Sequence, residues 1–314
     1  TDSSIDLGNG NDVLNITSSA LGYTSHLSRN LGNYDYSYNN QWSGSQSGDY
    51  TYSSRYFYPW SSYGWQGGGS YDDEWDYEYG YSSSGSWTDD EYSWLINTGI
   101  SKGAVNSRID TGKGDDSISI TATASSSATG LENSELSTSA GDDSVAATAT
   151  AEVSATAVAD SQVSTGTGDD SVAATATAEV SATAVADSQV STGTGDDSVA
   201  ATATAELSAT AVADSEVSTG DGDDSLEASA QADVIATAIA SSDVSTGTGD
   251  DSVAATATAE VSSTAVADSE VSTGDGDDSL EASAQADVIA TAIASSDVST
   301  GTGDDSVAAR ATAE

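Results

Sequence analysis

Paired aspartates that follow a glycine are the side chains of this chain best suited to chemistry. The tripeptide Gly-Asp-Asp recurs at unbroken intervals of 27 residues through the last two hundred residues of the sequence. Its glycines are Gly114, Gly141, Gly168, Gly195, Gly222, Gly249, Gly276 and Gly303. Carboxylates are hard oxygen ligands of the kind that Ca²⁺ takes, and glycine permits the positive φ angles that aim carbonyl oxygens inward. The spacing therefore predicts a row of turns that supply oxygen atoms to divalent cations.

A fixed period in this range is typical of coils stacked along one axis, so each turn should lie over the next. Between turns, apolar and polar residues alternate, with Val145, Val153 and Ala159 expected on the inner face and Thr148 and Val158 on the outer face. Alternation with period two indicates strands, although alanine by itself favours helix. We expect an all-β fold: a parallel β-solenoid with 27-residue coils, an Ala/Val core and one aromatic-rich insertion.

Each coil must bend, because twenty residues of unbroken strand would span roughly 65 Å. Two acidic positions recur between the glycine turns and divide the coil into three runs of about nine residues, which favours a triangular or flattened coil. These positions are Glu152, Glu179, Glu206, Asp233, Glu260, Asp287 and Glu314, and Asp160, Asp187, Asp214 and Asp268. The row at Glu152 has two interpretations, a solvated face or a further row of cation sites.

The turn has a recognisable spacing. Gly166-x-Gly168-x-Asp170-x-Val172 resembles the calcium-binding nonapeptide of the RTX (repeats-in-toxin) family, Gly-Gly-x-Gly-x-Asp-x-U-x. The resemblance covers nine turns and implies calcium held between stacked turns. The chain departs from the family pattern because Thr165 replaces the first glycine and because the motif comes once per 27 residues rather than in tandem. The resemblance therefore implies the family's cation but not its usual short coil.

The candidate calcium ligands form two sets, one for each aspartate of the turn. The second aspartate of each turn is the first choice: Asp12, Asp116, Asp143, Asp170, Asp197, Asp224, Asp251, Asp278 and Asp305. The preceding aspartate is the second choice: Asp115, Asp142, Asp169, Asp196, Asp223, Asp250, Asp277 and Asp304. A column of carboxylates at strand spacing repels itself strongly without a counter-ion, which argues against plain solvated turns.

A first coil lies apart from the others. Residues 8–14 repeat the turn spacing but precede the next turn by 104 residues instead of 27, which defines a first coil at residues 1–21, an insertion at 22–94 and the remaining solenoid at 95–314. The insertion holds all 14 tyrosines, all 6 tryptophans and the single histidine, His26. We expect it to pack on the solenoid or on a neighbouring molecule, since so many aromatic rings favour burial. The alternative is a low-complexity tether.

Composition excludes several functions. The formal charge of −45 repels nucleic acid and anionic lipid and attracts cations. The chain has no cysteine, and no apolar run is long enough to span a membrane. No catalytic constellation is visible, because His26 lies in the insertion, so we expect no enzyme activity.

Outward threonines suggest an alternative function. They stand at Thr148, Thr150, Thr175, Thr177, Thr202, Thr204, Thr256 and Thr258, and in the turns at Thr167, Thr194, Thr248 and Thr302. A Thr-x-Thr array on a flat solenoid is similar to that of ice-binding proteins, but Ser229, Gln231, Asp221 and Lys113 interrupt it, as do Ser283, Gln285 and Asp275. Threonine is also simply a good strand residue.

The two ends of the sequence suggest self-association. Glu314 stops at the coil phase of Glu152, and Thr1 has the phase of Ala159, so the ends differ by six residues in phase. Neither end shows the polar cap of a monomeric solenoid. We expect an extracellular, secreted or cell-surface structural protein that stacks head to tail into filaments and binds Ca²⁺, with the insertion contacting neighbouring filaments or cell-surface material. The alternatives are a repeat segment of a large calcium-dependent adhesin and an ice-binding protein.

Overall fold

The computed structural model describes residues 3–20 and 99–314 in full, and between them it describes only the strands β3–β8 and their pairing. The chain forms two compact units. One consists of Thr1–Ser18 with Ile100–Glu314, and the other is Ser19–Gly99. No helix in the described part of the chain is long and apolar enough to cross a membrane.

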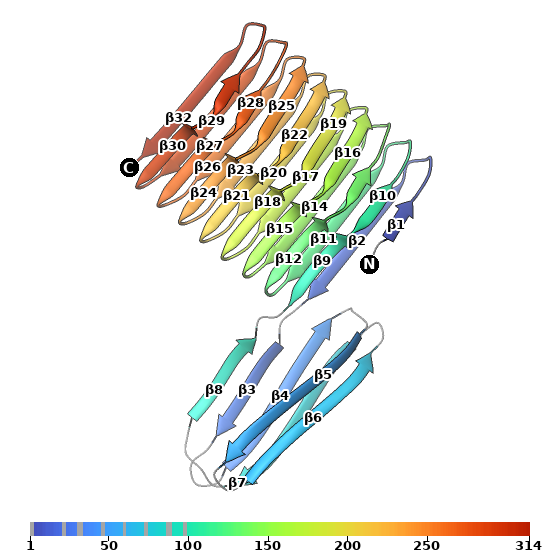
Figure 1. Ribbon diagram of the computed structural model, residues 1–314, viewed down its shortest axis with the longest axis vertical. Helices are drawn as coiled ribbons and strands as arrows, with labels where there is room; N and C mark the ends of the chain where they lie inside the picture. Colours follow the sequence, from blue (N-terminus) through green and yellow to red (C-terminus); the bar gives the residue numbers. More distant parts are fainter. Residues whose placement is uncertain are drawn as a thin grey trace. The chain divides into compact units, whose positions relative to one another are not determined.

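The first unit is a parallel β-solenoid in which each coil contributes one strand to each of three sheets (Figure 1). Sheet I follows the Gly-Asp-Asp turn, sheet II comes next along the coil, and sheet III leads to the next turn. Neighbouring strands are in register at 27 residues, as in Ser144 opposite Ser171 and Val145 opposite Val172. The predicted all-β solenoid with 27-residue coils is confirmed, and so is the three-sided coil.

The strand bounds repeat with the coil. Sheet I contains β2 (Val13–Ala20), β11 (Ser117–Ala124), β14 (Ser144–Ala151), β17 (Ser171–Thr177), β20 (Ser198–Thr204), β23 (Ser225–Gln231), β26 (Ser252–Thr258), β29 (Ser279–Ala286) and β32 (Ser306–Ala313). Sheet II contains β9 (Ile100–Val105), β12 (Ser127–Glu132), β15 (Ser154–Ala159), β18 (Ser181–Ala186), β21 (Ser208–Ala213), β24 (Ile235–Ala240), β27 (Ser262–Ala267) and β30 (Ile289–Ala294). Sheet III contains β1 (Ser3–Asp6), β10 (Ser107–Asp110), β13 (Glu135–Ser137), β16 (Gln162–Thr167), β19 (Gln189–Thr194), β22 (Glu216–Asp221), β25 (Asp243–Thr248), β28 (Glu270–Ser272) and β31 (Asp297–Ser299).

The core consists mainly of alanine and valine, as predicted. Val145, Ala149 and Ala155 are at most 3% exposed, and their equivalents in other coils are buried in the same way. Such small side chains bury little apolar area per coil, so the backbone hydrogen bonds between coils carry a large share of the cohesion.

The predicted inner face is wrong at two places, both near corners. Val153 was expected inside but is 41% exposed, because strand alternation ends with β14 at Ala151. Farther along the coil, Ala157 and Val158 are both buried, so Ala159 is left only partly buried. The alternation shifts there because the chain is about to turn at Asp160, whose φ of 49° lies in the left-handed region.

The second unit is a set of antiparallel strands. They are β3 (Tyr23–Arg29), β4 (Tyr34–Gly44), β5 (Gly48–Tyr58), β6 (Ser61–Tyr71), β7 (Trp75–Gly85) and β8 (Asp90–Ile96). The order β8-β3-β4-β7 forms one antiparallel group, and β5 pairs with β6. The sequence of the insertion predicts short strands at best, but these strands are 7 or 11 residues long. The side chains of this unit, including His26, lie outside the described residues.

One buried hydroxyl gives a stability prediction. Ser263 is fully buried, and its hydroxyl has no hydrogen-bond partner in the described part of the chain; the neighbouring coils place Ala236 and Ala290 opposite it. Replacing Ser263 by alanine should therefore raise the free energy of unfolding by about 1 kcal/mol, because an unpaired buried hydroxyl loses its hydration without compensation. Urea unfolding followed by circular dichroism measures the change.

The matched control is Ser161→Ala. The Ser161 hydroxyl donates to the Ala159 carbonyl and accepts from the Ser134 N–H, so its removal should lower the stability by about 1 kcal/mol. Equal effects of the two substitutions would contradict this account.

Candidate metal-binding turn column

The Gly-Asp-Asp turns of successive coils stack at the corner between sheets III and I and bring the two predicted sets of aspartates into two parallel rows. We call the second aspartates, Asp12 to Asp305, the inner row, and the first aspartates, Asp115 to Asp304, the outer row. The two rows differ in depth. Asp170 of the inner row is 2% exposed, whereas Asp169 of the outer row lies at the surface.

Local sequence explains the depth of the inner row. Asp170 stands two residues before the buried Val172, so strand alternation points both side chains inward. Gly168 has a φ of 127°, which a residue with a Cβ rarely adopts, and it reverses the chain directly before the aspartates. The same arrangement recurs at each glycine of the column.

The inner row is joined by backbone hydrogen bonds that run in one direction. One carboxylate oxygen of Asp170, Oδ1, accepts the N–H of Asp143 in the preceding coil at 2.8 Å. The pattern continues from the N–H of Asp12 to the carboxylate of Asp305. The outer row runs the opposite way, because the N–H of Asp169 donates to Oδ1 of Asp142 in the preceding coil at 3.1 Å.

The second oxygen of each inner carboxylate, Oδ2, is buried and has no hydrogen-bond partner in the described part of the chain. These orphaned oxygens belong to Asp12, Asp116, Asp143, Asp170, Asp197, Asp224, Asp251 and Asp278. A buried carboxylate oxygen without a donor is costly, since hydration is lost and nothing replaces it. Eight such atoms in one column indicate that a positive charge or a proton belongs beside them.

The raised pKa values of the inner-row aspartates also indicate that a positive charge or a proton is missing beside them. Burial raises the pKa of Asp224 to about 6, and the charges of Asp197 and Asp251 raise it further. The nearby Thr219 hydroxyl, which donates to the Thr246 carbonyl, and the Asp197 N–H, which donates to Oδ1 of Asp224, both act to lower it. Burial is also the largest cause of the raised pKa values of Asp143, Asp170, Asp197 and Asp251. The ionised form of the inner-row carboxyl groups is therefore disfavoured unless a cation compensates their charges.

Backbone carbonyl oxygens also lie in the turn column. A Cβ at Gly168 would lie 2.1 Å from the carbonyl oxygen of Gly141, so successive turns are packed carbonyl against Cα with no room for a side chain. Within the described residues, no three acidic or histidine side chains converge as a ready-made cation cage. A bound Ca²⁺ would therefore combine carboxylate, carbonyl and water oxygens, a mixture that its flexible coordination accepts. Among the described residues, the turns offer hard oxygen ligands of the kind that this ion takes.

The corner between sheets I and II carries the acidic row of Glu152, whose members are exposed at Glu179 and Glu206. Exposed apolar residues directly follow the acids, among them Val180 at 40% and Leu207 at 49% exposure. The sequence pattern predicted the acidic row but placed the apolar residues inside. We find no arrangement of side chains there, within the described residues, that would hold a metal.

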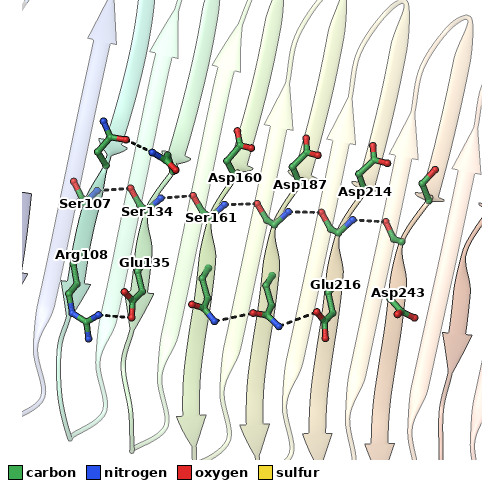
Figure 2. A pocket seen from close by; sticks show the side chains of 18 of the residues that line it. Ser107, Arg108, Ser134, Glu135, Asp160, Ser161, Asp187, Asp214, Glu216 and Asp243 are labelled. Carbon is green, nitrogen blue, oxygen red and sulfur yellow. Dashed lines mark hydrogen bonds and ion pairs between the residues drawn. The ribbon is translucent and has the colours of Figure 1, made fainter. Parts of the chain in front are cut away.

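The corner between sheets II and III forms a polar groove (Figure 2). Along it, the hydroxyl of Ser161 accepts from the N–H of Ser134 at 3.1 Å, and Gln162 donates to Gln189 at 3.0 Å. Serines at the position of Ser161 in successive coils form a row, which we call the serine row. It was not recognised in the sequence, because Ser161 looks like any small inward residue. Its 27-residue recurrence was the available signal.

The outward threonines stack in register on sheet I. Thr148, Thr175 and Thr202 pair across three successive coils, preceded by Thr121, and Ser229 interrupts the row. In the turns, the Thr248 hydroxyl donates to the Asp221 carboxylate at 2.9 Å. The threonines thus form a regular array that is limited in length.

No protein-family model matches the chain, and the search of curated proteins finds no significant match. The function is therefore argued from the geometry of the turns.

Proposed function

We propose that this protein is an extracellular structural protein, a calcium-stabilised β-solenoid that assembles head to tail into filaments. The observation that carries the proposal is the column of eight buried carboxylate oxygens without partners. Calcium would be held by the inner row together with turn carbonyls and, as second choice, by the outer row. When bound, it supplies the positive charge that the column lacks.

Electrostatics supports a structural role for the cation. Stacked strands lie about 4.8 Å apart, so unscreened carboxylates at that spacing repel one another along the whole column. The alanine-rich core provides limited burial with which to offset this repulsion. Cation binding to the folded turns alone then adds directly to stability. Weak sites of this kind fill at the millimolar calcium concentrations found outside cells.

The repetition of the coils supports the proposed head-to-tail assembly. Each coil donates and accepts backbone hydrogen bonds on both of its faces, and the register does not change along the array. A solenoid face left uncovered is thus complementary to the opposite face of another copy. Such a contact does not close on itself and builds an open filament. In this proposal the second unit contacts neighbouring filaments or cell-surface material.

Chelation tests the proposal. Excess EDTA should reduce the strand signal in circular dichroism and disperse filaments seen by negative-stain microscopy, and Ca²⁺ should restore both. Mg²⁺ is the control, because it demands small octahedral sites that mixed turn oxygens do not provide. If spectrum and filaments are the same in EDTA and in calcium, calcium has no structural role.

Two alternatives use the same fold. In a large adhesin the solenoid would act as a calcium-dependent spacer, and cell-binding by the intact chain without filaments would favour this role. The register of Thr148, Thr175 and Thr202 favours testing an ice-binding role as well. Thermal hysteresis that disappears when these threonines are replaced by lysine would support it.

A further inference from the structure

We propose that the corner between sheets I and II is a docking surface for a basic amphipathic helix of another protein. This surface lies at a different corner from the turn column, and its role does not depend on calcium there. Two rows of side chains run along it. The aliphatic row consists of Val153, Val180, Leu207, Val234, Val261 and Val288, and the acidic row consists of Glu152, Glu179, Glu206, Asp233, Glu260 and Asp287, each one residue earlier.

The exposed aliphatic side chains of the solenoid gather at this corner. In the aliphatic row, Val153, Val180, Leu207 and Val261 are 40% to 49% exposed, and Ile235, which follows the row, is 48% exposed. Away from this corner, the large apolar side chains that are exposed among the described residues are Leu7, Val13 and Val307, all in the first or last coil. Soluble proteins rarely expose a large continuous apolar stripe, and such a stripe marks a contact with another molecule.

The acidic row gives the same corner a negative charge. Glu179, Glu206 and Glu260 are exposed. The sequence contains no lysine or arginine between Lys113 and Arg310, so these coils supply no positive charge of their own. A partner that covers the corner therefore gains from positive charge beside its apolar side chains.

The two rows begin in the same coil. In the coil before Glu152 and Val153, the equivalent positions hold Ser125 and Ser126. From Glu152 to Val288, every coil has an acid followed by an aliphatic residue at this corner. The acidic and apolar side chains thus change together, as expected of one surface with two components.

Of three kinds of occupant, one matches both rows. A metal cation would neutralise the acids but leave the aliphatic side chains in water. A second copy of the chain would bring apolar side chains, but its own acidic row would repel the first, and each chain has a formal charge of −45. A basic amphipathic segment of another protein satisfies both rows, because its apolar side covers the aliphatic residues and its lysines or arginines face the acids.

The spacing of the coils favours a helix over a strand as the bound segment. Stacked strands repeat about every 4.8 Å, so the aliphatic row repeats at that interval along the solenoid axis. Side chains on one face of an α-helix recur about every 5.4 Å, whereas those on one face of a strand recur about every 6.6 Å. A helix laid along the corner therefore follows the aliphatic row more closely than a strand does.

A synthetic peptide tests this surface. It consists of leucine and lysine, with leucines three and four residues apart so that its helix has one apolar side. Fluorescence anisotropy in calcium-containing buffer should show saturable binding to the unaltered protein. The same peptide with glutamate in place of lysine should not bind, because both partners are then acidic. Equal binding of the two peptides would contradict the role of the acidic row.

Paired substitutions separate the two rows. Val180→Ser with Leu207→Ser should weaken binding about tenfold, because two apolar contacts are lost. The fold accommodates serine at this position, as Ser126 shows. Glu179→Gln with Glu206→Gln should weaken binding about threefold at low salt and less at high salt, since exposed ion pairs are weak and are screened by salt.

The matched control removes the same charge at another corner. Asp187 and Asp214 are exposed between sheets II and III, and Asn133 holds the equivalent position with a φ of 47°, so Asp187→Asn with Asp214→Asn keeps the backbone conformation. This variant should bind the peptide like the unaltered protein. Equal weakening here and at the acidic row, or unchanged binding after Val180→Ser with Leu207→Ser, would show attraction to net charge alone and overturn the proposal.

Hydrogen exchange on the unaltered protein covers the case in which a variant does not fold. The Glu179 and Glu206 amides are hydrogen-bonded at this corner, and the Asp187 and Asp214 amides are hydrogen-bonded at the other. Bound peptide should slow the exchange of the first pair and leave the second pair unchanged. Equal slowing of both pairs overturns the proposal.

Sedimentation of the protein without peptide tests a second copy as the occupant. Val180→Ser with Leu207→Ser should leave the association of the protein with itself unchanged, because head-to-tail contacts lie at the ends of the solenoid. Loss of self-association in this variant would assign the corner to a contact between copies and overturn the proposal of a basic partner.

Discussion

In calcium-free buffer the protein should become more stable, not less, when the pH is lowered from 7.5 to 5. Burial raises the folded-state pKa of Asp224 to about 6, above the ordinary 3.8, and shifts Asp143, Asp170, Asp197 and Asp251 in the same direction. A group with a raised folded-state pKa binds its proton more tightly when folded. Its stabilising contribution is complete below the unfolded pKa and is lost as the pH rises through the folded pKa.

The expected gain in stability at low pH is large because several carboxyl groups contribute. For Asp224 alone, the interval between 3.8 and about 6 corresponds to roughly 3 kcal/mol between its ends, as an upper value. Melting temperatures in EDTA at pH 7.5, 6.5, 5.5 and 5.0 measure the trend. With saturating calcium the trend should reverse over the same range, because protons then compete with the ion for the inner carboxylates.

Two isosteric variants locate this pH dependence. Asp224→Asn imitates the protonated inner carboxyl, so in EDTA it should raise the melting temperature at pH 7.5 and flatten the pH dependence. Asp223→Asn, in the exposed outer row of the same turn, removes the same charge without removing a buried one and should do much less. A melting temperature in EDTA that falls steadily on acidification, with equal behaviour of the two variants, would contradict the role of the inner row.

The second large effect concerns glycine. Replacing Gly195 by alanine should lower the free energy of unfolding by more than about 4 kcal/mol, because its Cβ would lie 2.0 Å from the Gly168 carbonyl oxygen while the residue holds a φ of 130°. The obstacle is the backbone of the preceding coil, which cannot move without breaking the turn column. Denaturant unfolding should show the loss as a separate early transition, since repeat arrays unfold in segments.

Gly10→Ala is the matched control, because it has a φ of 149° but meets nothing closer than the Asp12 Oδ1 at 3.9 Å. Only backbone strain remains there, of about 1–3 kcal/mol. The two glycines occupy the same place in their turns, so the difference between the variants isolates the contact between coils. Similar losses of stability would show that coil packing at this corner is looser than the structure indicates.

The sequence was most informative where its pattern is periodic. Alternation of residues such as Val145 and Thr148 predicts strand, and the recurrence of Gly168 and its equivalents predicts the stacking. The same alternation failed at Val153 and Val158, because it assumes an unbroken strand and the chain bends at both places. Bends depend on backbone conformations such as the left-handed one of Asp160, which a two-residue pattern does not contain.

The sequence predicted which residues make up the candidate site but not which of them are buried. Both aspartates of a turn are equally acidic in the sequence, and only the fold shows that Asp170 is buried with an unpaired oxygen while Asp169 is exposed. The opposite directions of their two hydrogen-bond rows also depend on the offset between coils. The serine row at Ser161 escaped notice because its hydroxyls act on backbone groups of the neighbouring coil, a relation that no local motif displays.

The constant register of the coils has a consequence for inheritance. Residues 144–170 and 171–197 are identical in sequence, and so are residues 225–251 and 279–305. Because each strand pairs with its equivalent one period away, a gene that gains or loses one whole period by unequal recombination encodes a chain with no mismatched strand at the seam. Repeated segments are the substrate of such recombination, and the fold accepts its products in steps of one coil. Length in this protein is therefore a heritable variable that selection can adjust without redesigning a core.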